Sequence, residues 1–280
     1  MRACRWNVVD QSYVDSIENW RKERAVKISA PHGWLATAGL FWLQEGINRM
    51  GADQSNPILL PNGSGPGLAG VFKLKGGEVS LDAADGVAFR LGDALISKTP
   101  IPIEDETSQP LFLNDLKIFV LQRGRRFGVR IFDPHNPALR DFGGLNWYPI
   151  DEDYQVTARF ISLPETQTIK IITVLGDQVE MPFPGTIEFS LQGKPFSLDP
   201  VGLDDGRLWL MFRDATNGSQ TYPAGRYLVT DAPQGGTVVL DFNKAYNPPC
   251  AYTDFATCPL PPGNNRLKLE ISAGEKRYRG

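Results

Sequence analysis

Residues 237–267 read TVVLDFNKAYNPPCAYTDFATCPLPPGNNRL and hold two of the chain's three cysteines together with five prolines. Two Pro-Pro pairs remove backbone donors and fix φ, so the chain after Asp241 can continue neither as a regular helix nor as a regular strand. A loop of this length in a compact domain is usually functional or disordered, and its aromatic residues favour an ordered loop. We therefore expect this stretch to carry the functional site.

The sequence on both sides of this stretch has the texture of β-structure. From Ile47 onward, short apolar or alternating runs are separated by Gly, Pro, Asn and Asp at spacings of about eight to twelve residues, as in sandwiches and barrels. Gly76-Gly77 lies between two such runs and predicts a hairpin. The expected strands are 58–60, 70–74, 78–81, 88–91, 117–123, 127–132, 156–162, 168–174, 186–191, 207–212, 226–229, 238–241 and 267–271.

The N-terminal residues have helical rather than strand periodicity. Over residues 10–29, apolar side chains such as Ile17 and Trp20 recur on one helical stripe, and Pro31 ends the pattern. Residues 33–45, GWLATAGLFWLQE, are apolar nearly all round and predict a second, buried helix.

The chain is expected to divide into three parts. Residues 1–46 form an N-terminal α-helical pair, residues 47–133 form a β-sandwich, and residues 134–280 form a C-terminal β domain that carries the long loop. Residues 133–148, DPHNPALRDFGGLNWY, are rich in Pro and Gly and predict a connector between the two β regions. The predicted fold class is mainly β, with two sandwich-like β regions.

Length, net charge and cysteine content limit the classes of protein to which the chain can belong. At 280 residues and 41% hydrophobic, the chain can bury one large core or two smaller ones. The net charge of −3 provides no attraction to nucleic acid or to an anionic membrane, so neither is expected as a partner. The N-terminus lacks the apolar region of a secretory signal, and no apolar run approaches the length of a membrane span. Three cysteines are too few for a disulfide scaffold, so we expect a cytoplasmic protein with reduced thiols.

Residues 46–133 resemble a forkhead-associated sandwich. The order GINRMGADQSNPILLP, VFKL, a hairpin to EVSLD and a final pair ending in VRIFD is similar to the order of strands in that family. Members that bind phosphothreonine carry an arginine directly after the glycine that matches Gly51, where this chain has Ala52. Their Ser-x-x-His turn is missing from the matching residues 65–70. We therefore expect no binding of phosphothreonine.

A second resemblance covers nearly the whole chain. TNGSQTYPAGRYL, VVLDFNKAYNPPCAYTDFATCPLPPGNNRL and AGEKRY, all between residues 216 and 278, closely resemble the hallmark motifs of domain-of-unknown-function family 1684. The earlier pieces NWRKER, HGWLATAGLFWLQEG and RIFD fit the same family. The resemblance implies membership of this family and implies no particular activity.

Cys250 and Cys258 allow three interpretations. A nucleophile requires a thiolate and a nearby base, and the two histidines, His32 and His135, are both distant in sequence. Packing among aromatic side chains is the favoured interpretation, because free cysteine is among the most buried residue types. A metal site is disfavoured, because a separation of eight residues differs from the spacing of structural zinc ligands. No metal is therefore expected.

The polar residues of the loop predict either a network that pins it or a pocket for a ligand. Asp241 and Asn243 alternate at the end of a strand, so their side chains point to the same side. Arg226 is the nearest cation in the preceding hairpin and is the expected partner of Asp241. The same set suits a hydroxyl-rich ligand. The candidate ligand-binding residues are Arg226, Asp241, Asn243, Tyr246, Asn247, Cys250 and Cys258.

Two classes of function remain open. One is a module that binds a small polar molecule in a pocket floored by residues 241–258. The other is a cytoplasmic, hydrolase-like enzyme with Cys250 or Asp241 as the reactive group and His32 as a further catalytic candidate. His32 lies between Pro31 and Gly33, where it can also serve only to cap or pack a helix. The P-loop, dinucleotide, zincin and G-x-S-x-G motifs are all missing, so no cofactor is expected.

Overall fold

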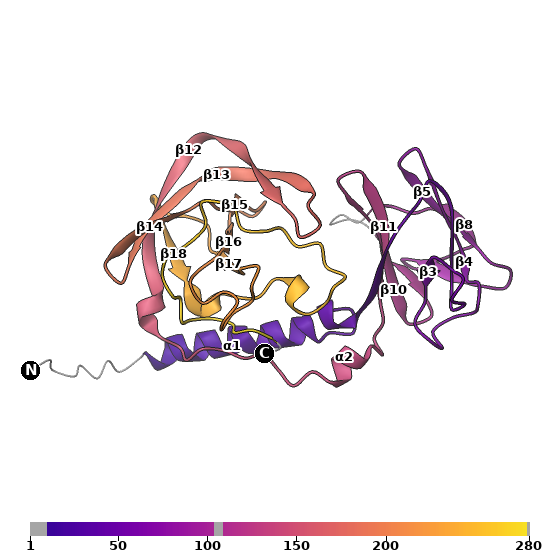
Figure 1. Ribbon diagram of the computed structural model, residues 1–280, viewed down its shortest axis with the longest axis horizontal. Helices are drawn as coiled ribbons and strands as arrows, with labels where there is room; N and C mark the ends of the chain where they lie inside the picture. Colours follow the sequence, from indigo (N-terminus) through magenta and orange to yellow (C-terminus); the bar gives the residue numbers. More distant parts are fainter. Residues whose placement is uncertain (1–9, 104–108, 279–280) are drawn as a thin grey trace, which may run out of the picture. The chain divides into compact units, whose positions relative to one another are not determined.

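A computed structural model describes residues 10–103 and 109–278, which fall into two compact units. Unit 1 combines Met1–Val26, Gly144–Tyr252 and Thr257–Gly280, and unit 2 combines Lys27–Gly143 and Thr253–Ala256. Both units are built mainly of strands, which confirms the predicted fold class (Figure 1). The first helix thus belongs largely with the C-terminal β region, whereas the sequence assigned it to a separate part covering residues 1–46.

Unit 2 is a sandwich of two sheets. One has the strand order β1-β11-β10-β9-β6-β7 and the other β3-β2-β4-β5-β8. Alternate side chains of both sheets, such as Phe72 and Ile118, meet in one buried core. The strands of the first sheet are β1 (Thr37–Trp42), β6 (Phe89–Leu91), β7 (Ala94–Ile96), β9 (Leu111–Leu113), β10 (Leu116–Arg123) and β11 (Arg126–Phe132). Those of the second are β2 (Gly46–Gly51), β3 (Ile58–Leu59), β4 (Gly70–Lys75), β5 (Glu78–Ala83) and β8 (Lys98–Pro100).

The expected second helix over residues 33–45 is wrong, so the N-terminal helical pair is a single helix. A 3₁₀ turn, η1 (Trp34–Ala36), leads into β1, which pairs antiparallel with β11. An apolar run without clear periodicity fits a buried strand as well as a buried helix. Strand β11 presents the fully buried Val129 and Ile131 beside it, and pairing with this neighbour decides the outcome.

Unit 1 also packs two sheets around a core. The four-stranded sheet has the order β14-β13-β12-β18, and the three-stranded sheet has the order β15-β16-β17. Leu240 from the first sheet and Leu210 from the second are fully buried in the shared core. The strands are β12 (Gln155–Ile172), β13 (Gln178–Leu191), β14 (Lys194–Leu198), β15 (Val201–Gly202), β16 (Leu208–Phe212), β17 (Arg226–Thr230) and β18 (Thr237–Asp241).

Strands β12 and β13 form a long antiparallel hairpin, which Figure 1 shows as a paired ribbon. The two strands expected at 156–162 and 168–174 are one strand, β12, with a register shift between Ser162 and Gln167. Pro164 lies inside this shift, where a residue without an N–H interrupts the ladder at least cost. The two predicted strands are therefore a single strand with an irregularity in its middle.

Helix α1 (Gln11–Ile28) confirms the helix predicted over residues 10–29. Its stripe faces unit 1: Ile17 is fully buried, and the Trp20 ring packs edge-on against Trp147 with centroids 5.7 Å apart. None of the described helices has the length and apolarity needed to cross a bilayer. The remaining helical turns are α2 (Pro137–Arg140), η2 (Glu152–Tyr154), η3 (Phe242–Lys244) and η4 (Pro249–Ala251).

Truncating the buried stripe of α1 should destabilise the protein. Ile17→Ala leaves a cavity in a fully buried site, and we expect a loss of about 2–5 kcal/mol in the free energy of unfolding. Val26→Ala is the matched control on the same helix, because Val26 is 68% exposed and its truncation should change stability by less than about 0.5 kcal/mol. Urea denaturation followed by tryptophan fluorescence measures both. Equal midpoints for the two variants would show that α1 is only loosely attached.

Candidate functional site

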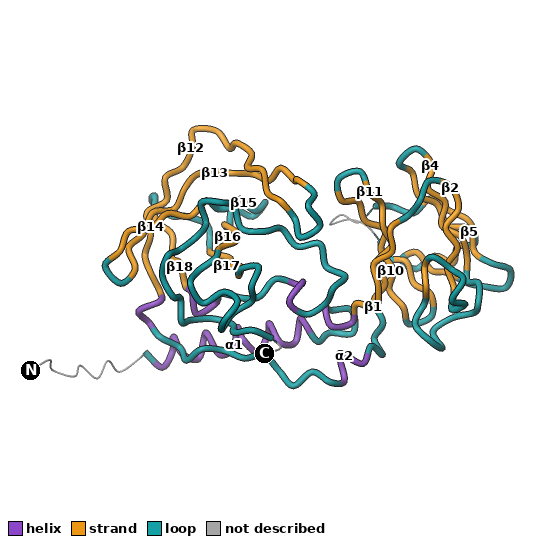
Figure 2. The backbone as a smooth tube through the Cα atoms, viewed as in Figure 1, coloured by secondary structure: helices purple, strands orange, loops and turns teal. Residues whose placement is uncertain are grey.

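The long loop is ordered, and its backbone follows no regular sheet. After β18 ends at Asp241, the chain forms the short turns η3 and η4, and residues 252–278 contain no named helix or strand (Figure 2). The strand expected at 267–271 is therefore wrong. Side chains take the place of a ladder there, because the Ile271 amide donates to Asp214 and the Ile271 carbonyl accepts from Arg226.

Arg226 pairs with Asp214 rather than with Asp241. Its Nη2 lies 2.7 Å from the Asp214 carboxylate, and both side chains are completely buried. The guanidinium also donates to the carbonyls of Ile271 and Ala273, while Asp214 accepts from the Thr216 amide at 2.8 Å. Phe212, two residues before Asp214, is the cross-strand partner of Arg226, so sheet pairing brings these two charges together. This pair ties the C-terminal segment to β17.

Asp241 and Asn243 do meet, as the sequence predicted, and α1 completes their cluster. The Tyr13 hydroxyl donates to Asp241 at 3.0 Å, and the Asn243 side-chain amide donates to the Tyr13 oxygen at 2.9 Å. Asn243 also exchanges hydrogen bonds with the backbone of Asp151, at 2.8 and 3.1 Å. Burial and the nearby Asp241 carboxylate raise the pKa of Tyr13 above its usual value, so the phenol keeps its proton and acts as a donor.

Asn247 belongs to a separate cluster centred on Glu275. Both residues are fully buried, and Glu275 accepts from the Asn247 backbone and side-chain amides at 3.1 and 2.9 Å. Arg24 of α1 lies 3.0 Å from the same carboxylate, and the Tyr252 hydroxyl donates to it. Arg24 also stacks over the Tyr246 ring, 4.2 Å from its centroid. The single network expected from the sequence is therefore three clusters. Two of them hold the loop at Asp241–Asn243 and at Asn247, and the third holds the C-terminal segment at Ile271 and Ala273.

Cys250 and Cys258 lie side by side, and neither is in a disulfide. The Cys250 amide donates to the Cys258 sulfur at 3.1 Å. Cys250 is half-buried, whereas Cys258 is 4% exposed. A hydrogen bond from the Cys258 thiol lowers the pKa of Cys250. The same hydrogen bond and burial raise the pKa of Cys258. The two thiols are thus chemically unequal.

The two histidines belong to a different unit from the cysteines and Asp241. Both His32 and His135 belong to unit 2, whereas Asp241, Cys250 and Cys258 belong to unit 1. The His32 ring packs edge-on against Phe112, with centroids 6.1 Å apart. Within the described residues, no group of three or more His, Cys, Asp or Glu side chains is arranged to hold a metal ion.

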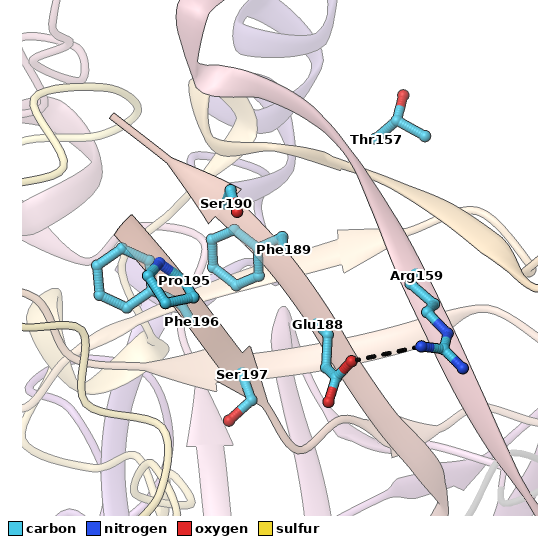
Figure 3. A pocket seen from close by; sticks show the side chains of 8 residues that line it. All are labelled: Thr157, Arg159, Glu188, Phe189, Ser190, Pro195, Phe196 and Ser197. Carbon is cyan, nitrogen blue, oxygen red and sulfur yellow. Dashed lines mark ion pairs between the residues drawn. The ribbon is translucent and has the colours of Figure 1, made fainter. Parts of the chain in front are cut away.

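A cavity lies on the outer face of the four-stranded sheet of unit 1, at residues that the sequence did not mark as a site. It is an open hollow of about 780 Å³ over β12, β13 and β14. Figure 3 shows Arg159 and Glu188 extending toward each other from neighbouring strands, with charged atoms 4.0 Å apart. The lining residues are Thr157, Arg159, Glu188, Phe189, Ser190, Pro195, Phe196 and Ser197.

Strand alternation explains this composition. Successive side chains of a strand point to opposite faces, so Ile187 and Leu191 enter the core while Glu188 and Ser190 face outward. The same alternation in β12 turns Thr157 outward beside the buried Ala158. A polar residue at every second position is the sequence signal for this surface, although it does not distinguish a hollow face from a flat one. A smaller cavity of about 290 Å³ shares Ser190 with it.

Comparison with known proteins identifies the family. Residues 140–276 match the family described as "Protein of unknown function (DUF1684)". An uncharacterised protein of Haloarcula marismortui, solved by NMR in solution, is 34% identical over a match that covers 50% of this chain and 80% of that protein. The chain belongs to the DUF1684 family. The TM-score to the Haloarcula protein is 0.42. The DUF1684 match falls almost entirely within unit 1, which carries the loop, the three clusters and the sheet-face cavity.

A forkhead-associated domain with phosphothreonine-dependent interactions is a weak structural neighbour of this DUF1684 protein. It is 13% identical, and the match covers 32% of this chain and 91% of that domain with a TM-score of 0.24. No curated protein is detectably similar to the chain. The expectation that phosphothreonine peptides do not bind stays a prediction from the sequence.

Removing the partner of Arg226 should destabilise the protein strongly. Asp214→Ala leaves a fully buried guanidinium without its counter-charge, and we expect a loss of about 3–5 kcal/mol in the free energy of unfolding. Asp205→Ala is the matched control, because its ion pair with Arg207 is about half exposed at both ends and should contribute at most about 1 kcal/mol. Chemical denaturation compares the two. A small effect of Asp214→Ala would show that the Arg226 charge reaches water.

Proposed function

We propose that this protein binds a small, neutral, hydroxyl-rich molecule on the outer face of the β12-β13-β14 sheet. The observation that carries the proposal is a hollow of about 780 Å³ in which an arginine and a glutamate lie on adjacent strands among hydroxyl side chains. Small-molecule sites typically occupy about 300–1,000 Å³ and use a few well-placed polar groups.

The ionic groups of the hollow are available to a ligand. Arg159 and Glu188 are direct cross-strand partners, and their side chains are 73% and 52% exposed. An ion pair that is 4.0 Å long and open to water contributes little stability, so either partner can rearrange toward a ligand at small cost. The guanidinium supplies donors only, and the carboxylate supplies acceptors only. Their opposite charges cancel, which favours a neutral ligand.

The remaining lining residues fit the same ligand class. Thr157, Ser190 and Ser197 each offer a hydroxyl that can both donate and accept. Pro195 and the partly buried Phe196 add apolar surface. Sugars and polyols combine hydroxyl groups with C–H faces, so they match both kinds of contact.

The proposal keeps the small polar ligand expected from the sequence and moves its site away from the 241–258 loop. Arg226, Asn243 and Asn247 are fully buried and hydrogen-bonded within the protein. A ligand could reach them only by breaking these bonds. In this proposal the loop is a scaffold that fixes the sheets, and rigid strands position the binding groups.

A hydrolase-like enzyme that uses Cys250 or Asp241 is the second candidate. The lowered pKa of Cys250, caused first by its hydrogen bond with Cys258, favours it. Asp241 is 6% exposed, and its Oδ1 accepts hydrogen bonds from Tyr13 and Asn243, which argues against a reactive carboxylate there. We also propose a cytoplasmic location, which the unbonded state of Cys250 and Cys258 supports.

Titration of the full chain with neutral monosaccharides and polyols, monitored by calorimetry and by ligand-observed NMR, tests the proposal. We expect saturable binding of at least one compound, weakened at least about tenfold by Glu188→Ala and by Arg159→Ala, because a lost hydrogen bond to a charged group costs about 1.5–3 kcal/mol. Arg207→Ala removes an exposed ion pair of the same unit and should leave affinity unchanged. No saturable binding, or equal binding by all three variants, would refute the proposed site.

A further inference from the structure

We propose that Cys250 and Cys258 form a redox-active dithiol, which a small peroxide such as hydrogen peroxide oxidises to an intramolecular disulfide. The proposal concerns chemistry separate from ligand binding on the sheet face. It begins from the adjacency of the two thiols: the Cys250 amide donates to the Cys258 sulfur at 3.1 Å, although the residues are eight apart in the chain.

The backbone around Cys258 is anchored to the end of the long hairpin. The Cys258 carbonyl accepts from the Val174 amide at 2.8 Å, and the Leu260 amide donates to the Ile172 carbonyl at 2.7 Å. From β17, the Tyr227 hydroxyl donates to the Pro259 carbonyl at 2.6 Å. Cys258 is therefore held by contacts that do not involve Cys250.

Cys250 is held independently in the short turn η4. The Ala251 amide donates to the Pro248 carbonyl at 2.9 Å, which closes the turn around Cys250. The Tyr222 hydroxyl donates to the Cys250 carbonyl at 3.0 Å. Because each cysteine has its own anchors, bringing the sulfurs together requires little further ordering of the loop.

The two thiols have different roles in the proposed reaction. Cys250 is half-buried and its pKa is lowered, so it is the thiol that a small peroxide reaches and that ionises first. Cys258 is 4% exposed and its pKa is raised, so it stays protonated beside the reactive sulfur. An accessible, easily ionised cysteine next to a second cysteine is the arrangement found in redox-sensing sites.

The reaction balances without any group beyond the peroxide. The Cys250 thiolate attacks one peroxide oxygen, the O–O bond breaks, and hydroxide leaves with Cys250 as sulfenic acid. The Cys258 sulfur then attacks the Cys250 sulfur, the S–O bond breaks, and the second hydroxide leaves. The first hydroxide takes up the proton that Cys250 released when it ionised, and the second takes up the Cys258 proton, so two thiols become one disulfide and hydrogen peroxide is reduced to two waters. A thiol reductant reverses the change by disulfide exchange.

Mass spectrometry of the full chain tests this directly. The protein is treated with hydrogen peroxide, quenched, unfolded, alkylated and digested with trypsin, which releases residues 245–266 as one peptide that contains both cysteines. We expect both to be alkylated before oxidation. After oxidation we expect an unalkylated peptide lighter by two hydrogens, and reduction should restore both alkylation sites.

Single variants separate the two roles. Cys258→Ser should leave Cys250 as a sulfenic acid that dimedone traps, whereas Cys250→Ser should leave Cys258 unmodified at the same dose. Cys4→Ser, which changes the third cysteine, is the control and should not alter disulfide formation. The proposal is overturned if both cysteines stay alkylatable at a dose that oxidises free cysteine, if the disulfide forms only between chains, or if the two single variants behave in the reverse order.

Discussion

The buried ion pair between Arg226 and Asp214 is the interaction on which the rest of unit 1 depends. It replaces a missing β-ladder, because Arg226 donates to the carbonyls of Ile271 and Ala273 while Asp214 accepts from the Ile271 amide. A C-terminal segment without regular strands would otherwise bury unpaired backbone groups, at a cost of about 1–3 kcal/mol for each. One guanidinium and one carboxylate thus allow an irregular segment to close the core.

The other two polar clusters attach helix α1 by partly buried hydrogen bonds. Tyr13 joins Asp241 and Asn243, and Arg24 joins Glu275 and Asn247, so one helix hydrogen-bonds both the first part of the loop and the C-terminal segment. Asp241, Asn243, Asn247 and Glu275 lie in the stretches that resemble the family's motifs, yet they form hydrogen bonds inside the protein. A polar motif in a family can therefore mark a structural network as easily as a site that meets a ligand, and exposure is what distinguishes the two. By that criterion, Arg159 and Glu188 on the outer sheet face and the half-buried Cys250 are accessible to a ligand or a reagent.

Much of the fold follows from local sequence. The periodicity of α1, the turn residues between strands and the proline pairs of the 237–267 stretch act within a few residues, so each could be read directly. The second predicted helix failed because the apolar run at 33–45 has no period that separates a buried helix from a buried strand, and only pairing with β11 decides it. The closing strand at 267–271 failed for a similar reason, since long-range side-chain bonds replace its ladder.

For the candidate site, the sequence by itself determined which residues are polar, which alternate on a strand and that two cysteines share one ordered loop. It also correctly joined Asp241 with Asn243, although for another reason than strand alternation: β18 ends at Asp241, whose side chain caps the turn η3 that contains Asn243. Only the tertiary structure decided that Arg226 meets Asp214, that Asn247 meets Glu275, and that Cys250 and Cys258 touch. These partners are separated by eight to 28 residues in the chain, and their approach depends on how sheets and turns pack. Burial likewise depends on packing, so the sequence could nominate polar residues but could not tell which of them face water.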